Sequence, residues 1–164
     1  MKFETNKAIE ILERTPLVLN SLLRGVGDEW IMSNEGADTF SPYDVVGHLI
    51  HGEKTDWVVR AKIILEQGVN KPFDPYDRFA QYEESKGKSL EQLLDEFETI
   101  RKENVAWLQA IELTETDLER KGMHPVLGEV SLRNLLSTWV VHDLTHIAQI
   151  TRVMSKQYVE EMGP

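Results

Sequence analysis

The chain has 164 residues, 41% of them hydrophobic, and its 28 acidic and 18 basic side chains give a formal net charge of −10. This length and composition suffice for one core, so residues 1–164 are predicted to form a single domain. The negative charge repels phosphate backbones and no run of Lys or Arg offsets it, so we expect no nucleic-acid partner. The chain has no cysteine, which excludes disulfides, thiolate metal sites and a cysteine nucleophile.

The sequence also indicates where the protein acts. No apolar stretch approaches the ~20 residues that are needed to span a bilayer. The first residues, 1–7, contain no apolar run suited to a signal peptide. We therefore expect a cytoplasmic protein without a membrane partner.

The first predicted element covers about residues 5–24, where apolar side chains recur at helical spacing. Pro16 lies inside it and predicts a kink or a break, because proline lacks the N–H that continues a helix. Gly25 and Gly27 are expected to end this element. Residues 28–40 read as a loop with one short turn near its start.

The second predicted helix has a well-marked beginning. Ser41 can cap it, Pro42 suits the first helical position, and Asp44 stands at the acidic third position of a capping arrangement. The apolar pattern then continues to Gly68, a natural stop. Because this helix is apolar on more than one side, we expect it to be a central member of a bundle.

Residues 69–88 form a long polar connection, and long connections of this kind are often functional. Whether it closes over a site is left open by the sequence. The third predicted helix begins at Ser89, where Gln92 completes a capping box, and its apolar stripe runs to Ile111.

The last part of the chain contains one more long helix. Residues 114–117 are expected to form a short turn, and residues 121–130 a loop or a small extended excursion. Ser131 then caps a helix that runs to about Tyr158. Four helices of unequal length around one core predict an all-α fold, a four-helix bundle.

Two histidines of this last helix, His142 and His146, are four residues apart and share one helix face. Leu135, Trp139 and Val153 lie on the same stripe, so that face points inward at least in part. A buried imidazole without a partner costs roughly 1–3 kcal/mol. One metal ion would satisfy both rings, and hydrogen bonds within an ordinary core are the alternative.

A third histidine, His48, lies on the second helix in a stripe with Gly52 and Thr55, whose small side chains leave room for an ion and its solvent. His51 is the alternative ligand from this helix, about 60° away around it, and is expected to support the site or lie at the surface. Three histidines with open coordination positions are typical of a catalytic metal centre.

Three further residues are candidates for the surroundings of this site. His124 precedes Pro125 in a loop and is predicted either to form a pocket wall or to be exposed to solvent. Asp143 points about 100° away from His142 around the helix, which predicts a hydrogen bond to a neighbouring helix or to a metal-binding residue rather than metal ligation. Gln149 lies one turn after His146, on the face where it can orient water or a ligand.

Residues 41–49, 124–128 and 139–150 together resemble the DinB/YfiT-like family, and the resemblance covers essentially the whole chain. It implies a four-helix bundle in a mirror variant of the up-and-down topology. It also implies one divalent metal ion bound by His48 of the second helix and by His142 and His146 of the last. Family members are frequently homodimers. Characterised relatives include thiol-dependent enzymes, such as bacillithiol S-transferases and a mycothiol-dependent maleylpyruvate isomerase.

The sequence thus predicts a metal-dependent enzyme that acts on a small molecule. Imidazole ligands suit Zn²⁺ or Ni²⁺. A thiol cosubstrate bound to the ion would give S-transfer, whereas bound water would give hydrolysis. The alternative is a non-catalytic metal-binding or stress-associated bundle, in which a fourth protein ligand such as His51 or a carboxylate would close the site. A bundle with core histidines and no metal is a further alternative.

Overall fold

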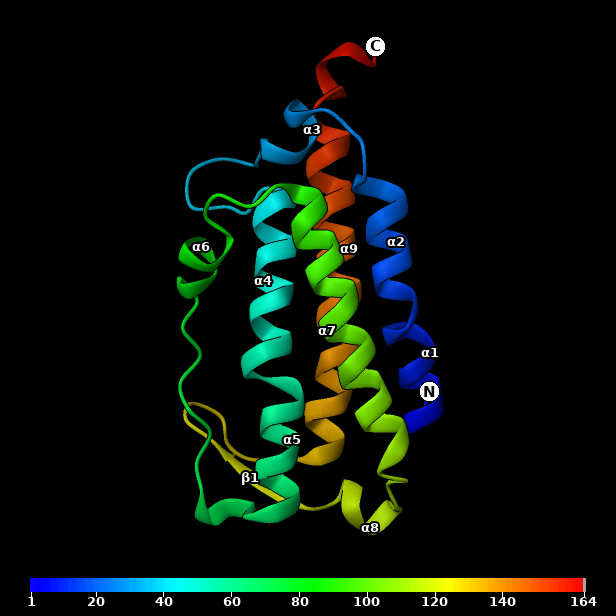
Figure 1. Ribbon diagram of the computed structural model, residues 1–164, viewed down its shortest axis with the longest axis vertical. Coiled ribbons are helices and arrows are strands. Elements are labelled where there is room, and N and C mark those ends of the chain that lie inside the picture. Colours follow the sequence, from blue (N-terminus) through cyan, green and yellow to red (C-terminus); the bar gives the residue numbers. More distant parts are fainter. Residues whose placement is uncertain (164) are drawn as a thin grey trace.

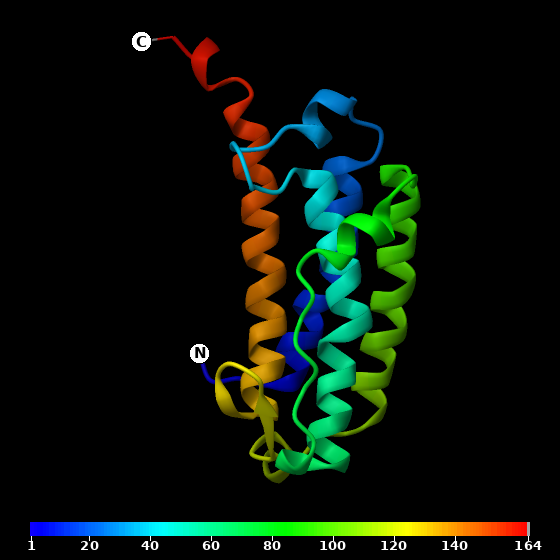
Figure 2. The same ribbon diagram turned by 90° about the vertical axis from the view of Figure 1, so that its left-hand side faces the viewer.

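The computed structural model of the protein describes residues 1–163. Its four long helical segments run side by side, as Figures 1 and 2 show, and two of the four are broken into shorter helices. The predicted all-α four-helix bundle is confirmed. None of the helices in residues 1–163 is long and apolar enough to cross a membrane. The segments are α1 (Thr5–Leu12) with α2 (Arg14–Leu23), α4 (Pro42–Thr55) with α5 (Trp57–Glu66), α7 (Leu90–Ala110) and α9 (Leu132–Lys156).

The first segment breaks at Glu13, three residues before Pro16. Because Pro16 has no N–H, it cannot donate to the Leu12 carbonyl, which would be its partner in a continuous helix. The Arg101 side chain of α7 donates to that carbonyl instead, at 3.0 Å. The break predicted for this segment therefore exists, and a buried arginine uses the acceptor that the proline leaves free.

The second segment was predicted to be one helix from Pro42 to Gly68, and this is wrong, because it is interrupted at Asp56. Its beginning is as predicted, since Ser41 and Asp44 form a capping box. Beyond the interruption, the Trp57 indole packs against Gly52: a Cβ added to Gly52 would lie 3.3 Å from the indole nitrogen. The space expected there for an ion and its solvent is therefore filled by Trp57.

The connection 69–88 is more ordered than a plain loop. It begins with a 3₁₀ turn (Gly68–Asn70), buries Phe73 and contains a further helix, α6 (Ala80–Ser85). The Phe73 N–H donates to the Met123 carbonyl at 2.9 Å, which links the connection to the segment around residue 123. Figure 2 shows the connection running along the outside of α4 and α5, and α6 contacts α4.

The other two connections, residues 24–41 and 111–131, also contain short elements. The predicted turns are present as α3 (Asp28–Met32) and α8 (Glu115–Leu118), and residues 121–131 form an antiparallel hairpin of β1 (Lys121–His124) and β2 (Gly128–Ser131). Ser131 and Asn134 form a capping box at the start of α9.

The core consists of two apolar clusters separated along the bundle by polar side chains. One cluster includes Trp57 and Trp139, and the other includes Leu49 and Phe97. On α4, α7 and α9 alike, buried charged residues fall between the positions that build the two clusters: Glu53, Arg101 and Asp143. The polar layer is therefore set at mid-height by the sequence order of each helix, and on α9 this stretch also contains His142 and His146.

Candidate metal centre

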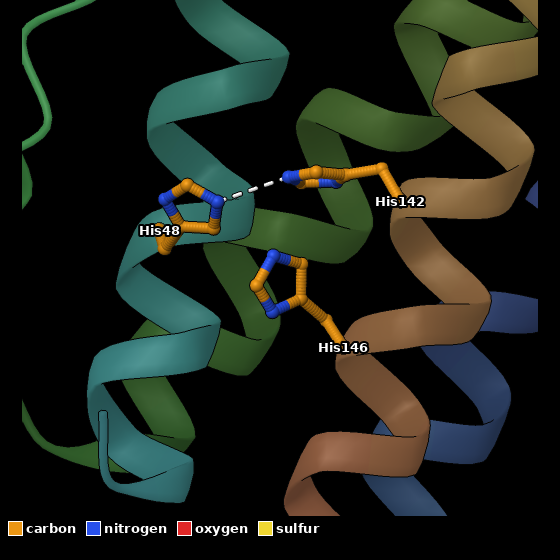
Figure 3. A group of neighbouring side chains, drawn as sticks. All are labelled: His48, His142 and His146. Carbon is orange, nitrogen blue, oxygen red and sulfur yellow. Dashed lines mark hydrogen bonds between the residues drawn. The ribbon is translucent and has the colours of Figure 1, made fainter. Parts of the chain in front are cut away.

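Three histidines meet between α4 and α9, as Figure 3 shows. His48 comes from α4, and His142 and His146 come from consecutive turns of α9. One ring nitrogen of each lies within 4.8 Å of the corresponding nitrogens of the other two. The ring centroids are 4.4 to 5.0 Å apart. The structure therefore brings together the three residues that the helical spacing selected.

Burial keeps the His48 and His146 imidazoles neutral at physiological pH. It lowers the pKa of His48 to about 3, with the neighbouring His146 and His142 adding to the effect. It also lowers the pKa of His146 to about 4, with a further contribution from His142. A neutral imidazole carries the lone pair that a cation requires, so the surroundings favour the ligand form.

Two of the rings are oriented by a neighbouring side chain. The His48 Nδ1 atom lies 2.8 Å from the Tyr76 hydroxyl, and the His146 Nδ1 atom lies 2.8 Å from Gln149 Oε1. Because an amide oxygen only accepts, the His146 Nδ1 atom carries the proton and its Nε2 atom keeps a lone pair. Hydrogen bonds to the outer nitrogen fix ring orientation in many metal sites. Tyr76 and Gln149 can serve that purpose here.

The spacing of the nitrogens fits a divalent cation. The Nε2 atoms of His48 and His142 are 2.9 Å apart. Two imidazoles on one tetrahedral Zn²⁺ would have their nitrogens ~3.3 Å apart. At 2.9 Å one of these nitrogens donates a hydrogen bond to the other, drawn as the dashed line in Figure 3. A single cation bound by the three nitrogens would take the place of that proton.

No fourth side chain completes the cluster in the described part of the chain, where the group that could hold an ion consists of the three histidines alone. His51, the alternative ligand from α4, is buried and bonds to Glu84 on α6, with its Nδ1 atom 3.0 Å from Glu84 Oε1. Lys54 lies 3.7 Å from the other oxygen of Glu84. The cluster is therefore open toward an exogenous ligand.

Asp143 points away from the cluster, as its helical position predicts. It forms an ion pair with Arg101 of α7 at 2.6 Å and accepts a hydrogen bond from the Thr15 hydroxyl at 2.7 Å. Burial alone would raise the pKa of Asp143, but the Arg101 charge and the hydrogen bonds from Arg101 and Thr15 together outweigh it and hold that pKa below its ordinary value. Its Oδ1 atom is 3.9 Å from the His142 Nδ1 atom, too far for a hydrogen bond. That His142 nitrogen is buried and has no partner within residues 1–163.

The structure places His124 outside this site. It ends β1, and its Nδ1 atom accepts from the backbone N–H groups of Val126 and Leu127 at 3.1 Å. The hairpin contacts α5, at the end of the bundle away from α3 (Figure 1). His124 therefore caps a turn and does not form a wall of the histidine site.

The connection 69–88 supplies polar residues that sequence reasoning missed. Tyr76 contacts His48, and α6 places Gln81 and Glu84 against α4. The length of the connection was the one signal that pointed to it. No periodic pattern identifies Tyr76 or Gln81, because both depend on how an irregular segment packs.

Comparison with known proteins identifies the family. Residues 11–150 match the model of the DinB superfamily, so the chain belongs to this superfamily. The structure is similar to that of YfiT from Bacillus subtilis, described as "a probable metal-dependent hydrolase with an unusual four-helix bundle topology". The TM-score is 0.81 and the identity 25%, and the match covers 96% of this chain and 89% of YfiT.

One further relative and one further solved structure are similar to this chain. The "Putative metal-dependent hydrolase OB0782" of Oceanobacillus iheyensis is 23% identical over 153 residues, which are 93% of this chain and 87% of that protein. TT2238, described as a four-helix bundle protein, has a TM-score of 0.55 at 18% identity over 91% of this chain and 99% of its own. The latter supports the fold alone. The relatives and the three-histidine cluster together support a metal-dependent function.

Proposed function

We propose that this protein is an enzyme that hydrolyses a small molecule with the help of one divalent cation bound by His48, His142 and His146. The observation that carries the proposal is the convergence of three imidazoles with no fourth protein ligand in residues 1–163. Structural metal sites are usually closed by four protein ligands, whereas catalytic sites keep a position open. The descriptions of YfiT and the Oceanobacillus protein support the same reaction class.

Nitrogen ligands suit Zn²⁺ or Ni²⁺ best among the abundant divalent ions. Such an ion polarises a bound carbonyl and lowers the pKa of a bound water or thiol. The side chains around the site orient the histidine ligands and shield them from water. Tyr76 and Gln149 hold the outer nitrogens of two ligands, and the Trp57 ring packs edge-on against His142 with centroids 5.0 Å apart. Phe40 lies beside His48 at 5.5 Å.

Thiol-dependent S-transfer is the second candidate reaction. It is favoured by the absence of cysteine from a chain whose nitrogen ligands leave a position open. The thiol would then be a small-molecule cosubstrate. Turnover assays with and without added low-molecular-weight thiols separate the two reactions, because hydrolysis proceeds without a thiol and S-transfer does not.

Metal content tests the site directly. Untagged wild type and the variants His48→Ala, His142→Ala and His124→Ala would be exposed to Zn²⁺ or Ni²⁺, desalted and analysed by mass spectrometry. We expect about one ion per chain in wild type, and background levels in the first two variants, since two nitrogens bind an ion weakly. His124→Ala is the matched control, because it removes a histidine outside the cluster, and it should retain the ion.

Two outcomes would contradict the proposal. Background metal in wild type would leave a bundle with ordinary core histidines. Full metal occupancy together with a spectrum of a closed, four-ligand site after Co²⁺ substitution would indicate a non-catalytic metal-binding protein.

We also propose that the protein is a homodimer, which the resemblance to its family implies. Exposed apolar side chains on α9 and on α2, which contacts it, support this proposal: Leu17, Val141 and Leu144 are 62%, 61% and 47% exposed. On a chain of net charge −10, such a face is suited to self-association. Light scattering should give twice the chain mass for wild type and a monomer for Leu144→Lys. A monomeric wild type would contradict this.

A further inference from the structure

Helix α6 is held against one face of α4, next to His48. The Tyr43 hydroxyl lies 2.7 Å from the Ser85 carbonyl oxygen and 2.9 Å from that of Lys88. One turn further along α4, Gly47 allows a close approach, since a Cβ there would lie 2.4 Å from the Ser85 hydroxyl oxygen. Another turn on, His51 bonds to Glu84. The position of α6 is thus fixed by three contacts at four-residue spacing.

This helix buries a carboxamide that has no partner. Gln81 is 1% exposed, and neither its Nε2 nor its Oε1 atom has a hydrogen-bond partner among residues 1–163. Removing an amide from water without a compensating hydrogen bond is costly, and folded proteins satisfy nearly all such groups. A buried, unpaired amide beside an open site therefore indicates a group that is satisfied by a ligand.

The surroundings of Gln81 place it at the histidine cluster. The Gln81 backbone carbonyl oxygen lies 3.9 Å from the position that a Cβ on Gly47 would take, and Gly47 directly precedes His48. The Gln81 carboxamide is also among the groups that act on the pKa of His48. His48 does not need Gln81 for its own orientation, because its Nδ1 atom is paired with Tyr76 and its Nε2 atom faces His142. The carboxamide is therefore available to a molecule that enters the site.

The chemistry of the group selects the class of that molecule. A carboxamide is neutral and offers N–H donors and a carbonyl acceptor together. The charged residue next to it on α6, Glu84, is paired with His51 and Lys54. Phe40 lies between His48 and Tyr82, with ring centroids 5.5 and 6.3 Å away, and adds an aromatic wall. An amide is the neutral group that complements both hydrogen-bonding functions.

We propose that Gln81 binds the exogenous ligand of the three-histidine centre, and that this ligand is a small amide whose carbonyl oxygen and N–H both pair with the Gln81 side chain. This inference rests on the proposed metal-dependent function and specifies its substrate class. Gln81 then contacts the substrate, whereas Tyr76 and Gln149 act on the metal ligands.

The proposal is tested by the affinities of two probes for the Co²⁺-loaded protein. Binding of each probe is measured from the change in the visible spectrum of the ion. Acetohydroxamic acid carries a carbonyl oxygen and an N–H, whereas azide has neither. Gln81→Met keeps the length of the side chain and removes its polar atoms. We expect this variant to bind Co²⁺ as wild type does and to bind acetohydroxamic acid about tenfold more weakly. Its affinity for azide should change by less than about threefold, since no amide pairing is lost.

Thermal unfolding of the metal-free variant adds a readout that separates a ligand-binding role from a structural one. Removing an unpaired buried amide should raise the Tm by about 2–8 °C. Gln149→Met is the control, because it should weaken Co²⁺ binding itself. A lower Tm for Gln81→Met, or unchanged affinity for acetohydroxamic acid, would overturn the role of Gln81. Equal losses for both probes would overturn the amide class. Absence of Co²⁺ binding in wild type would instead contradict the proposed function on which this inference rests.

Discussion

The bundle contains two buried polar groups built from the same helices, and they differ in how completely they are paired. On one side, Glu53 of α4 and Asp143 of α9 enclose Arg101 of α7. On the other, His48 of α4 faces His142 and His146 of α9. In the first group every carboxylate oxygen accepts hydrogen bonds, with Thr15, Asn104 and Trp139 as further donors. Among the atoms of these three charged side chains in residues 1–163, the Arg101 Nε atom alone lacks a partner.

The histidine group is paired less completely. Tyr76 and Gln149 take the Nδ1 atoms of His48 and His146, and the Nε2 atoms of His48 and His142 share one hydrogen bond at 2.9 Å. The His142 Nδ1 atom is buried without a partner among residues 1–163. A buried group whose charges are paired within the protein stabilises one arrangement of the helices. A buried group that leaves lone pairs facing one another is suited to a ligand. We therefore interpret the Arg101 group as structural and the histidine group as functional. Each of the following experiments tests that difference.

The largest effect is expected from Arg101→Met. It leaves the Glu53 and Asp143 carboxylates buried without their cation, and removal of one partner from a buried ion pair costs about 3–5 kcal/mol. The free energy of unfolding in urea measures the loss. Lys102→Met, at the exposed neighbouring position, should change it by less than about 0.5 kcal/mol. A loss below about 1 kcal/mol for Arg101→Met would show that the ion network is dispensable.

The next effect is stabilisation by the metal. At a free metal concentration one hundred times Kd, binding adds about 2.7 kcal/mol to the stability of wild type. For a chain of this size that raises the Tm by about 5–10 °C. His48→Ala should show no such increase, because it removes a ligand. An equal increase in both proteins would place the ion elsewhere.

A smaller effect is expected from Tyr76→Phe, which removes the hydroxyl 2.8 Å from the His48 Nδ1 atom. Loss of such an orienting hydrogen bond typically weakens metal binding by about 10–100-fold. Competition with a chelator measures the affinity. Tyr82→Phe, a half-exposed neighbour on α6, is the control and should bind the ion as wild type does. Equal affinities for all three proteins would exclude Tyr76 from the positioning of His48.

The most gradual effect is the pH dependence of the metal-free protein. In the folded state the pKa values of His48 and His146 are about 3 and about 4, below the unfolded value of ~6.5. As the pH falls below ~6.5, the unfolded chain binds protons that the folded chain does not, so stability decreases. The slope is at most about 1.4 kcal/mol per pH unit for each histidine, and solvent screening of these partly exposed rings reduces it. Urea unfolding of chelated protein between pH 7 and pH 4 should show a steeper fall for wild type than for His48→Gln. Parallel curves would contradict the assignment.

The helix beginnings show how much local sequence determines. Ser41 with Asp44, Ser89 with Gln92, and a capping serine at position 131 all begin helices in the structure as predicted. Capping uses atoms within three residues of each other, so its outcome depends little on the rest of the fold. The helical period likewise aligns His142 with His146, since both lie on one rigid helix.

The interruption at Asp56 and the buried Gln81 show what local sequence leaves undetermined. Apolar periodicity continues through Asp56, and the break accompanies the packing of Trp57 over Gly52. Residues 69–88 carry little periodicity, so neither α6 nor the contact of Tyr76 with His48 could be read from their order. Such contacts depend on distances between segments that are far apart in the chain.

The sequence by itself determined the helical class, the helix starts and the three histidines that share a site, because spacing along a helix fixes the direction of each side chain. Only the tertiary structure decided which groups surround them. It paired Asp143 with Arg101, turned His51 toward Glu84, kept His124 in the hairpin and brought Gln81 beside His48. The physical reason is that burial and pairing of polar groups depend on how helices pack against one another, which periodicity within a single helix does not specify.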